Sequence, residues 1–347
     1  MRRVRLAGTI TSMLLLMAGV SSTAAVAEPA AEHHGAGVLV WSRFDGSHDG
    51  TGRIVRADPD GEHVRAITHP PTGVFDEDPK ISPDGRRVLF ARNVPSQGLV
   101  EIGVVGIDGR GERILDLHCT DPCVGVEGPN WTPDGRQLVY GRIIGPIDPT
   151  NGNAVGEPLY RSDLDGGFQT RLTSFDAVRA SFAPDGYIVF LRPNPSDGHT
   201  AVFRMDADGG HVRQLTPWSI DADLPDVSPA TSGPTRNLVV FETYGQGPPG
   251  GTASAVATVP ATCQSLEQCT HQIRYLTSST ALPDQNFNPS WSPNGRQIIY
   301  CHFAYVDPGP AVGDIWTMRF NGTGKTPVST DPRFEFRPAW GRLAPSN

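Results

Sequence analysis

The chain has 347 residues, of which 38% are hydrophobic and 19% are charged, and its formal net charge is −8 at pH 7. Because an acidic chain without a basic patch repels phosphate backbones, we expect no nucleic acid partner. After residue 27 no apolar run approaches the ~18 residues that a membrane-spanning helix needs, so we expect no membrane span.

The first 27 residues have the layout of a secretory signal peptide. A basic start, MRRVR, precedes an apolar stretch (residues 6–20), and the small residues after it end in AVA (residues 25–27). This order predicts cleavage before Glu28 and secretion of the mature chain, with residues 28–36 as a short segment ahead of the fold. Cleavage would change the net charge from −8 to −11, because three arginines are lost.

From residue 37 onward the chain repeats a turn of the type Ser-Pro-Asp-Gly, each time followed by a strand pattern. The turn recurs roughly every fifty residues, a period typical of an array of supersecondary units. Proline presets the first turn dihedral, and glycine accepts the positive φ that follows. The copies start at Ser82, Thr132, Ala183 and Ser292, with a degenerate copy at Ser228.

Alternating apolar positions after each turn, rich in β-branched and aromatic residues, predict a strand. A hairpin and a short fourth strand follow, as in residues 202–216. No stretch of the mature chain carries a convincing helical period, so each unit is predicted to be four antiparallel strands.

A lone four-stranded unit would leave its outer strands unpaired, and a radial arrangement of the units solves this problem. We therefore predict an all-β fold, a six-bladed β-propeller over residues 37–342 whose first strands line a central channel. Residues 37–44 match a second strand and residues 336–342 match a first strand, so pairing between them would close the ring, with residues 343–347 as a tail. The residues expected between neighbouring blades are Ile81, Trp131, Phe182, Val227, Trp291 and Trp340.

Five cysteines fit an oxidising compartment, where disulfides persist. Cys119 lies close to Cys123 in sequence, and Cys263 lies close to Cys269, so we expect two local disulfides. Cys301 lies in an apolar strand pattern and is expected to be buried and reduced. A zinc site is disfavoured because neither close pair has two-residue spacing.

The repeats resemble those of the TolB-like, or PD40 (WD40-like), β-propeller family, whose signature is Pro-x-Trp-Ser-Pro-Asp-Gly before an apolar strand. The resemblance covers residues 37–342 and is closest at residues 129–140 and 289–300. It implies the propeller fold. It leaves the function open, because similar propellers serve as protein-binding modules, as gating domains of serine peptidases and as glycan-cleaving enzymes.

Polar residues just before the proline column of the first strands are predicted to ring the channel mouth. Carboxylates and guanidinium groups in a confined place suit a small polar ligand or a peptide end. The alternative is mutual salt bridging that holds the blades together. The candidates are Glu77, Asp78, Glu127, Arg179, Asp223, Asn288 and Arg337.

A second column of residues, two positions beyond the strand aromatic, should point toward the same rim. Arginine suits bidentate carboxylate recognition, and we expect its partners to be the acids of the first ring. An unpaired guanidinium would instead indicate a foreign anion. The column comprises Arg43, Arg92, Arg142, Arg192, Thr243 and His302, of which Arg92, Arg142 and His302 are further ligand-binding candidates.

Two patterns that could indicate a metal are interpreted as structural. Asp-x-Asp-Gly at residues 58–61, 163–166 and 206–209 lacks the closing glutamate of a calcium loop, so hairpin turns are expected. His118 and His302 could lie on the rim, but no i, i+4 pair or His-x-His spacing supports a histidine site. We predict no metal and no cofactor.

Three long connections between second and third strands should project from the ring face, where loops on a rigid scaffold carry recognition; the alternative is plain spacers. They are residues 143–158, 244–252 and 303–314, with Tyr244, Phe303 and Tyr305 as aromatic surface.

Together these features predict a secreted monomer that binds protein, peptide or carbohydrate at the channel mouth. The alternative is an extracellular polysaccharide lyase or glycosidase that uses Asp78, Glu127 or Asp223. Hydrolysis would require two of these carboxylates within about 5 to 10 Å of each other.

Overall fold

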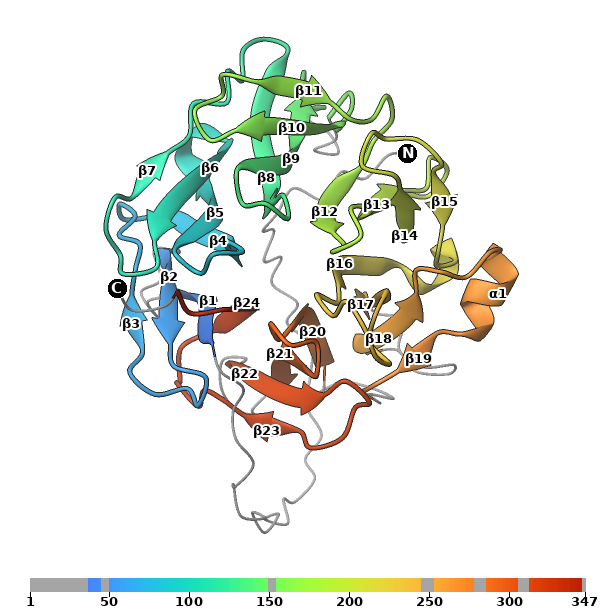
Figure 1. Cartoon of the computed structure of the whole chain (residues 1–347). Coiled ribbons are helices and arrows are strands. Elements are labelled where there is room, and N and C mark those ends of the chain that lie inside the picture. Colours follow the sequence, from blue (N-terminus) through green and yellow to red (C-terminus); the bar gives the residue numbers. More distant parts are fainter. Residues whose placement is uncertain are drawn as a thin grey trace, which may run out of the picture.

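The computed structural model describes residues 37–44, 50–148, 154–244, 253–277, 285–304 and 312–344, and the predicted signal peptide lies outside these ranges. Within them almost all of the regular secondary structure is β-strand. Figure 1 shows the sheets arranged in a ring, with β4, β8, β12, β16, β20 and β24 nearest its centre.

Four of the sheets have four antiparallel strands each, as the repeat predicts. In chain order their strands are β8 (Cys123–Trp131), β9 (Gln137–Ile144), β10 (Leu159–Asp163) and β11 (Gln169–Arg171); β12 (Val178–Phe182), β13 (Ile188–Pro193), β14 (Thr200–Met205) and β15 (Arg213–Gln214); β16 (Ala222–Val227), β17 (Leu238–Thr243), β18 (Ala255–Pro260) and β19 (Arg274–Tyr275); and β20 (Gln285–Trp291), β21 (Gln297–Ala304), β22 (Val312–Arg319) and β23 (Thr326–Pro327).

The remaining strands form one eight-stranded mixed sheet, which differs from the separate antiparallel units predicted. Its two halves meet at a single parallel pair, Gly52 opposite Phe75. Glycine permits this close approach, because a Cβ at Gly52 would lie 3.2 Å from the Cβ of Phe75. The strands are β1 (Val38–Phe44), β2 (Gly52–Ala57), β3 (Arg65–Ala66), β4 (Phe75–Ile81), β5 (Arg87–Val94), β6 (Leu99–Gly106), β7 (Arg113–Ile114) and β24 (Glu335–Gly341).

The first and last strands of the described chain pair with each other. β24 runs antiparallel to β1, with Trp340 opposite Leu39 and Glu335 opposite Arg43. Across this pair Trp41 Nε1 donates a hydrogen bond of 2.7 Å to Glu335 Oε1. Segments almost 300 residues apart in sequence therefore share one sheet, as the matching of residues 37–44 with residues 336–342 predicts.

Hydrophobic clusters between neighbouring units form the core of the described chain, and each joins two consecutive units of the repeat. In one cluster Leu89 of β5 packs with Trp131 and Tyr140 of the next sheet. Trp131 Nε1 also donates to the backbone oxygen of Lys80, 2.8 Å away on the neighbouring inner strand. Trp131 thus joins adjacent sheets by packing and by hydrogen bonding, and Trp291 does the same through the backbone oxygen of Asp226.

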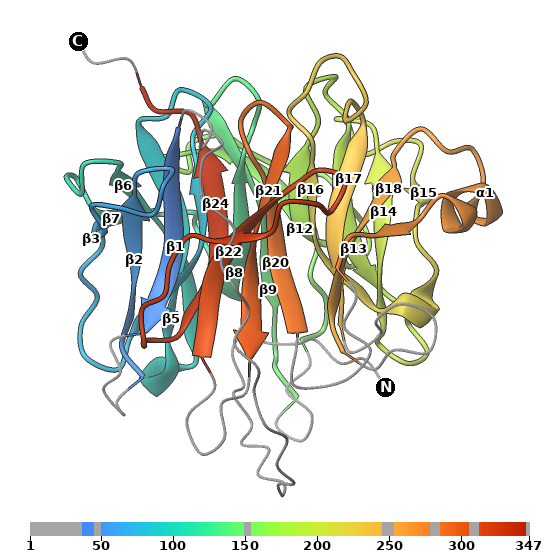
Figure 2. The same cartoon turned by 90° about the horizontal axis from the view of Figure 1, so that it is seen from below.

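The sheets stand upright between two faces (Figure 2). We call the face with the Ser-Pro-Asp-Gly turns, such as residues 82–85 and 132–135, the turn face. The opposite face, where the inner strands begin and where the second and third strands are joined, as at residues 95–98 and 193–199, is the loop face. Because every inner strand runs from the loop face to the turn face, equivalent residues of the repeats lie at the same depth.

Both predicted cysteine pairs lie at disulfide distance, with Cα–Cα separations of 5.1 Å for Cys119–Cys123 and 5.2 Å for Cys263–Cys269. Cys301 is buried and free, and its Sγ lies 3.2 Å from the backbone oxygen of Glu335 on β24.

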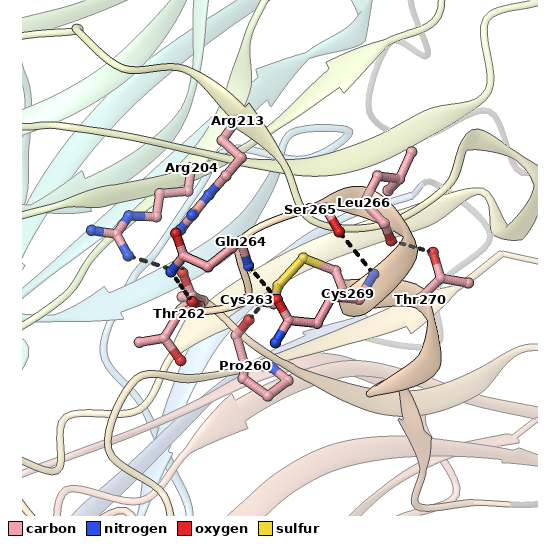
Figure 3. The surroundings of a disulfide bond; sticks show 12 residues. Arg204, Arg213, Pro260, Thr262, Cys263, Gln264, Ser265, Leu266, Cys269 and Thr270 are labelled. Carbon is pink, nitrogen blue, oxygen red and sulfur yellow. Dashed lines mark hydrogen bonds between the residues drawn. A yellow bond between two sulfur atoms is a disulfide. The ribbon is translucent and has the colours of Figure 1, made fainter.

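The second disulfide loop contains a short helix that the sequence pattern did not reveal, α1 (Leu266–His271). Ser265 caps it by accepting a hydrogen bond from the backbone N–H of Gln268. Six residues are too few to show a helical period, so the expectation of no helix was wrong here. Arg204 and Arg213 of the preceding sheet anchor the segment by donating to the backbone oxygen of Ala261 (Figure 3). Two 3-10 turns, η1 (Pro95–Gln97) and η2 (Trp218–Ile220), complete the helical elements described.

Within the described ranges no helix combines the length and apolar character needed to span a membrane.

Candidate functional site

Each inner strand carries the same backbone irregularity beside the channel. Its register with the second strand shifts at a bulge, as between Glu77 and Lys80 of β4. The residue within the bulge has a positive φ, a conformation that costs most residues about 1 kcal/mol or more. Its recurrence in every inner strand shows that the fold requires it. The residues are Asp78 (φ 52°), Gly128 (58°), Arg179 (55°), Leu224 (47°), Asn288 (51°) and Arg337 (53°).

Four of the predicted ring residues therefore occupy the bulge position, namely Asp78, Arg179, Asn288 and Arg337. Glu127 and Asp223 lie one residue earlier, because Gly128 and Leu224 directly precede the prolines of their strands. The prediction chose charged residues instead of the residues that align directly before the proline. In these two strands it therefore named a residue one position too early.

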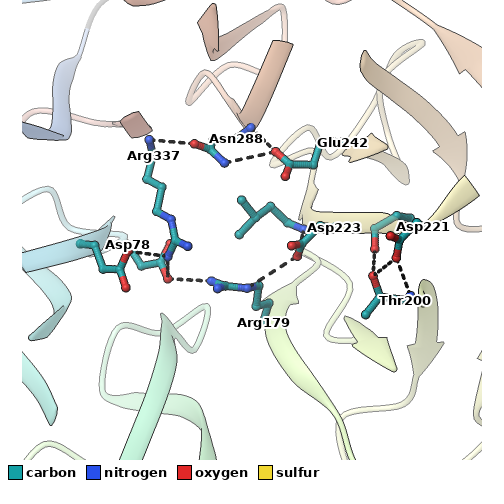
Figure 4. Close-up of polar contacts among 11 residues, drawn as sticks. Asp78, Arg179, Thr200, Asp221, Asp223, Glu242, Asn288 and Arg337 are labelled. Atoms are coloured by element: carbon teal, nitrogen blue, oxygen red, sulfur yellow. Dashed lines mark hydrogen bonds and ion pairs between the residues drawn. The ribbon is translucent and has the colours of Figure 1, made fainter. Parts of the chain in front are cut away.

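The guanidinium groups of the ring converge on one carboxylate. Asp78 Oδ2 accepts a hydrogen bond of 2.6 Å from Arg179 Nη1 and another from Arg337 Nη1. Arg179 Nε in turn lies 3.6 Å from Asp223 Oδ1. Figure 4 shows that these side chains reach across the channel from inner strands that are not all neighbours.

On the other side of the ring the side-chain amide of Asn288 links the polar groups. Asn288 Nδ2 donates to Glu242 Oε2 at 3.2 Å, and the backbone N–H of Asn288 donates to the same oxygen. Asn288 Oδ1 accepts from the backbone N–H of Arg337, 3.1 Å away (Figure 4). The polar groups therefore bond mainly to one another, which supports the predicted alternative of mutual bridging between blades.

Burial and charge act in opposition on the two acids of β4. Burial alone would raise the pKa of Asp78, but the charges of Arg179 and Arg337 outweigh it and hold this pKa well below its usual value. For Glu77 burial prevails, so its pKa is raised although Arg337 Nη1 lies 3.1 Å from its Oε2. Asp78 is therefore an ionised structural acid and is unsuited to donate a proton.

The channel is narrow at the level of the ring. The cavity there measures about 30 Å³ and is lined by the bulge residues and by the residues that follow them, which are prolines except for Ala180. This space admits only a water molecule or two. A ligand larger than water must therefore bind at one face of the ring.

The arginine column does have partners, but they are not the acids of the ring. Arg92 binds Asp76 in a bidentate manner at 2.7 and 2.8 Å. Arg43 Nε donates to Glu335 Oε1 at 2.6 Å. Both acids lie on the neighbouring inner strand directly opposite the arginine, so strand register selects them.

The two remaining arginines of the column lie against aromatic rings. The guanidinium carbon of Arg142 is 4.4 Å from the centre of the Tyr160 ring, and that of Arg192 is 4.6 Å from the centre of the Phe175 ring. Among the described residues neither arginine forms an ion pair with a carboxylate. The expected pairing with ring acids was therefore wrong for the whole column.

The structure does not bring the two candidate rim histidines into a metal site. His118 is exposed beside Asp116, and His302 packs on Trp316 with ring centres 5.0 Å apart. Within the described chain no group of three or more His, Cys, Asp or Glu residues is placed to hold a metal ion. The Asp-x-Asp-Gly segments form hairpin turns, as when the N–H of Gly61 donates to the oxygen of Asp58 at 2.9 Å.

Sequence reasoning named only one member, Phe303, of a larger aromatic feature on the loop face. Phenylalanines from β1, β4, β20, β21 and β24, and from the residue before β24, form a continuous group there, which we call the phenylalanine cluster. Its neighbouring rings have centroid distances between 5.4 and 6.2 Å. All six side chains are only partly buried. They are Phe44, Phe75, Phe287, Phe303, Phe334 and Phe336, while Tyr305 and residues 245–252 lie outside the described chain.

The aligned repeats contain a signal for this cluster. Phe287 and Phe336 stand just before the bulge residues of their strands, at the position that Glu77, Glu127 and Asp223 fill in others. A search for charged candidates alone passes over them.

Comparison with known proteins gives relatives of low overall identity. No family model matches the chain. An uncharacterised protein of Agrobacterium fabrum (strain C58) is 22% identical over 236 residues, which cover 67% of this chain and 72% of that protein. The Tol-Pal system protein TolB of Rhizorhabdus wittichii is 41% identical over 61 residues, which are 18% of this chain and 13% of that protein.

Solved structures match most of the chain. TolB from Acinetobacter baumannii superposes with a TM-score of 0.64 at 18% identity, covering 88% of this chain and 67% of that one. Putative TolB from Agrobacterium tumefaciens gives a TM-score of 0.57 at 15% identity, covering 89% of this chain and all of that one. This chain has a TolB-like β-propeller fold. A hydrazine synthase chain of Kuenenia stuttgartiensis matches the TolB-like propeller over 47% of its length, with a TM-score of 0.65 at 14% identity, so the fold alone assigns no activity.

The TolB-like propeller is expected to lose stability as pH rises from about 4.5 to 8. Burial, together with the charge of Asp223, raises the pKa of Glu242 to about 8. The folded protein therefore holds a proton on Glu242 that the unfolded chain releases, and each added pH unit costs at most about 1.4 kcal/mol. Urea unfolding at several pH values should show that the free energy of unfolding of Glu242→Gln depends less on pH than that of the parent protein. The exposed acid variant Glu62→Gln should keep the slope of the parent protein, and an unchanged slope in Glu242→Gln would contradict the assignment.

Proposed function

We propose that this TolB-like propeller is a secreted six-bladed ring, closed by the pairing of β1 with β24, that acts as a binding module at the loop-face mouth of its channel. The two cysteine pairs fit an oxidising compartment. The partner is a peptide or protein segment that presents apolar side chains. The observation that carries this proposal is the phenylalanine cluster.

Large apolar groups that stay partly exposed at the rim of a rigid ring are typical of interaction sites. Phe44 lies at the centre of the cluster and contacts Phe75, Phe334 and Phe336. Aromatic side chains supply much of the binding energy in protein interfaces, because they bury large areas with little loss of conformational freedom.

The polar ring prevents the partner from passing through the channel. Because Asp78, Arg179 and Arg337 close the channel to about 30 Å³, a peptide cannot pass through it. It can rest only on the mouth. The ion pairs also fix the inner strands relative to one another, so the mouth is preorganised and the cost of ordering it on binding is small.

Photocrosslinking tests the position of this surface. We expect p-benzoylphenylalanine at Phe75 to give saturable covalent capture of a protein or peptide from the secreted fraction of the native host. The same residue at the exposed turn-face position Pro184 should give none. Phe334→Ser should lower capture at Phe75 about tenfold while the thermal midpoint shows the protein folded. Capture at Pro184 alone, or no capture at either face, would refute the proposal.

A carbohydrate-active enzyme, a lyase or a glycosidase, is a second candidate because of one pair of acids. Asp223 and Glu242 lie directly opposite each other on β16 and β17, and the raised pKa of Glu242, about 8, would keep it protonated as a general acid at neutral pH. A glycan screen on residues 28–347, run with and without chelator, separates the two functions. Turnover that is lost in Glu242→Gln would establish the enzyme, and binding without turnover would favour the module.

A further inference from the structure

A second and larger cavity opens on the loop face, away from the channel. It lies between the sheet β8–β11 and the sheet β12–β15 and measures about 550 Å³, within the size range of small-molecule sites. None of its described lining residues also lines the narrow part of the channel at the polar ring. We call it the arginine cavity. The residues that matter here are Arg142, Tyr160, Arg171, Phe175, Asp176 and Arg192.

Among the described residues, Arg192 has no polar partner where it lines this cavity. Its guanidinium lies over the rings of Phe175 at 4.6 Å and Phe203 at 5.8 Å, and the side chain is partly buried. In the described part of the chain no group accepts a hydrogen bond from it. The rings hold the guanidinium plane in place while its N–H donors stay available along its edges.

Arg142 approaches the cavity from the neighbouring sheet in a similar way. It stacks on Tyr160, and its Nη2 donates to the backbone oxygen of Leu117 at 2.6 Å and to the side-chain oxygen of Gln169. In the described ranges its buried Nε has no hydrogen-bond partner. The Tyr160 ring and the two hydrogen bonds thus hold Arg142 in place, and its Nε–H donates no hydrogen bond within the described chain.

Comparison within the repeat shows what these two arginines lack. The equivalent residues Arg43 and Arg92 each bind an acid that stands opposite them on the inner strand. Opposite Arg142 the strand has Val126. For Arg192 the equivalent position is Ala177, directly before the pair Val178–Leu191. Two adjacent units therefore keep the arginine of the column and lack its internal counter-ion.

The charge of the cavity lining is positive. Three arginines line it, whereas Asp176 is its one acidic residue among those described. Asp176 Oδ1 is also engaged, because it accepts a hydrogen bond of 2.9 Å from the backbone N–H of Glu157. The cavity thus presents uncompensated guanidinium groups beside apolar walls.

We propose that the arginine cavity binds a small organic anion with two or more carboxylates, which bridges Arg142 and Arg192. The flat guanidinium forks match planar carboxylates, each of which can accept two N–H bonds. The cavity is far larger than an inorganic ion, and its prolines and aromatic rings can cover the carbon skeleton of such a ligand. This site is separate from the phenylalanine cluster and does not depend on the function proposed above.

Isothermal titration of residues 28–347 with citrate tests the proposal. We expect saturable binding that Arg192→Gln and Arg142→Gln each weaken at least tenfold. Arg110→Gln, which removes one exposed charge elsewhere, should leave the affinity unchanged. Arg192→Lys keeps the charge but loses the fork, so its affinity should lie between those of Arg192→Gln and the parent protein.

Several results would overturn the assignment. These are no citrate binding to the parent protein, equal losses in Arg192→Gln and Arg110→Gln, or phosphate binding as tightly as citrate. Because Arg192 donates no hydrogen bond within the described chain, its replacement should lower the thermal midpoint only by the loss of its stacking on Phe175 and Phe203, and a single cooperative transition would separate lost binding from lost folding. Citrate binding that survives in Phe334→Ser would confirm that the cavity is independent of the phenylalanine cluster.

Discussion

Removal of the chain from Phe336 onward is expected to abolish cooperative thermal unfolding. The truncation deletes most of β24 and so leaves β1 without its neighbour along the register from Val38 to Ser42. It also removes Trp340, which packs with Trp41 in the cluster between the first and last units. Loss of one large buried side chain alone typically costs about 3–5 kcal/mol, comparable with the whole stability of many domains.

Differential scanning calorimetry and near-ultraviolet circular dichroism would measure this effect. The matched control is truncation after Arg342, which removes only residues 343–347 and keeps every residue of β24. That control should melt in a single transition close to that of the full chain. If the longer truncation melted in the same way, the pairing of the two ends would contribute nothing to stability, and the closure we propose would be wrong.

Asp78→Asn is expected to lower the free energy of unfolding by about 3–5 kcal/mol, because it leaves two partly buried guanidinium groups without their shared counter-ion. Arg179 and Arg337 both donate to Asp78 Oδ2. Since burial is outweighed by these arginines and the pKa of Asp78 is held well below 3.8, the stabilisation is complete above about pH 4. It is lost as pH falls through the lowered pKa, so the difference between variant and parent should shrink in acid.

Urea unfolding at pH 7 and pH 3 would measure both parts of this prediction. Asp108→Asn is the matched control, because Asp108 is exposed and its nearest guanidinium, that of Arg110, is 3.9 Å away and also exposed. Exposed pairs of this kind contribute about 0–1 kcal/mol. A similarly small loss in the free energy of unfolding of Asp78→Asn would show that the ion pairs of the ring do not stabilise the fold.

Much of the fold follows from short-range patterns. The turn beginning at Ser82 and its copies set the period, the alternation after them sets the strands, and the tryptophan column identifies the residues between sheets. The two cysteine pairs were predictable because each closes a short loop. The parallel pair Gly52–Phe75 was not, because it depends on two chain segments meeting outside the repeat.

The candidate site was predictable only in part. Alignment on the prolines identifies Asp78, Arg179, Asn288 and Arg337, since equivalent positions of a repeat lie at one depth in the channel. It does not show that Arg179 of β12 reaches past β8 to Asp78 of β4, because that contact depends on the length and direction of the arginine side chain. The residue that faces Arg142 is Val126 and not an acid, but the sequence could not show which residue faces Arg142 until the strand register was known.

The buried thiol of Cys301 makes the seam between β21 and β24 open to chemical measurement. Burial raises the pKa of this thiol well above its usual value, and β24 lies against its sulfur. While the strands remain together, alkylating reagents should not reach it, and the four other cysteines are already oxidised. The rate at which the native protein takes up one equivalent of reagent would therefore report how often the last strand detaches, without any engineered probe.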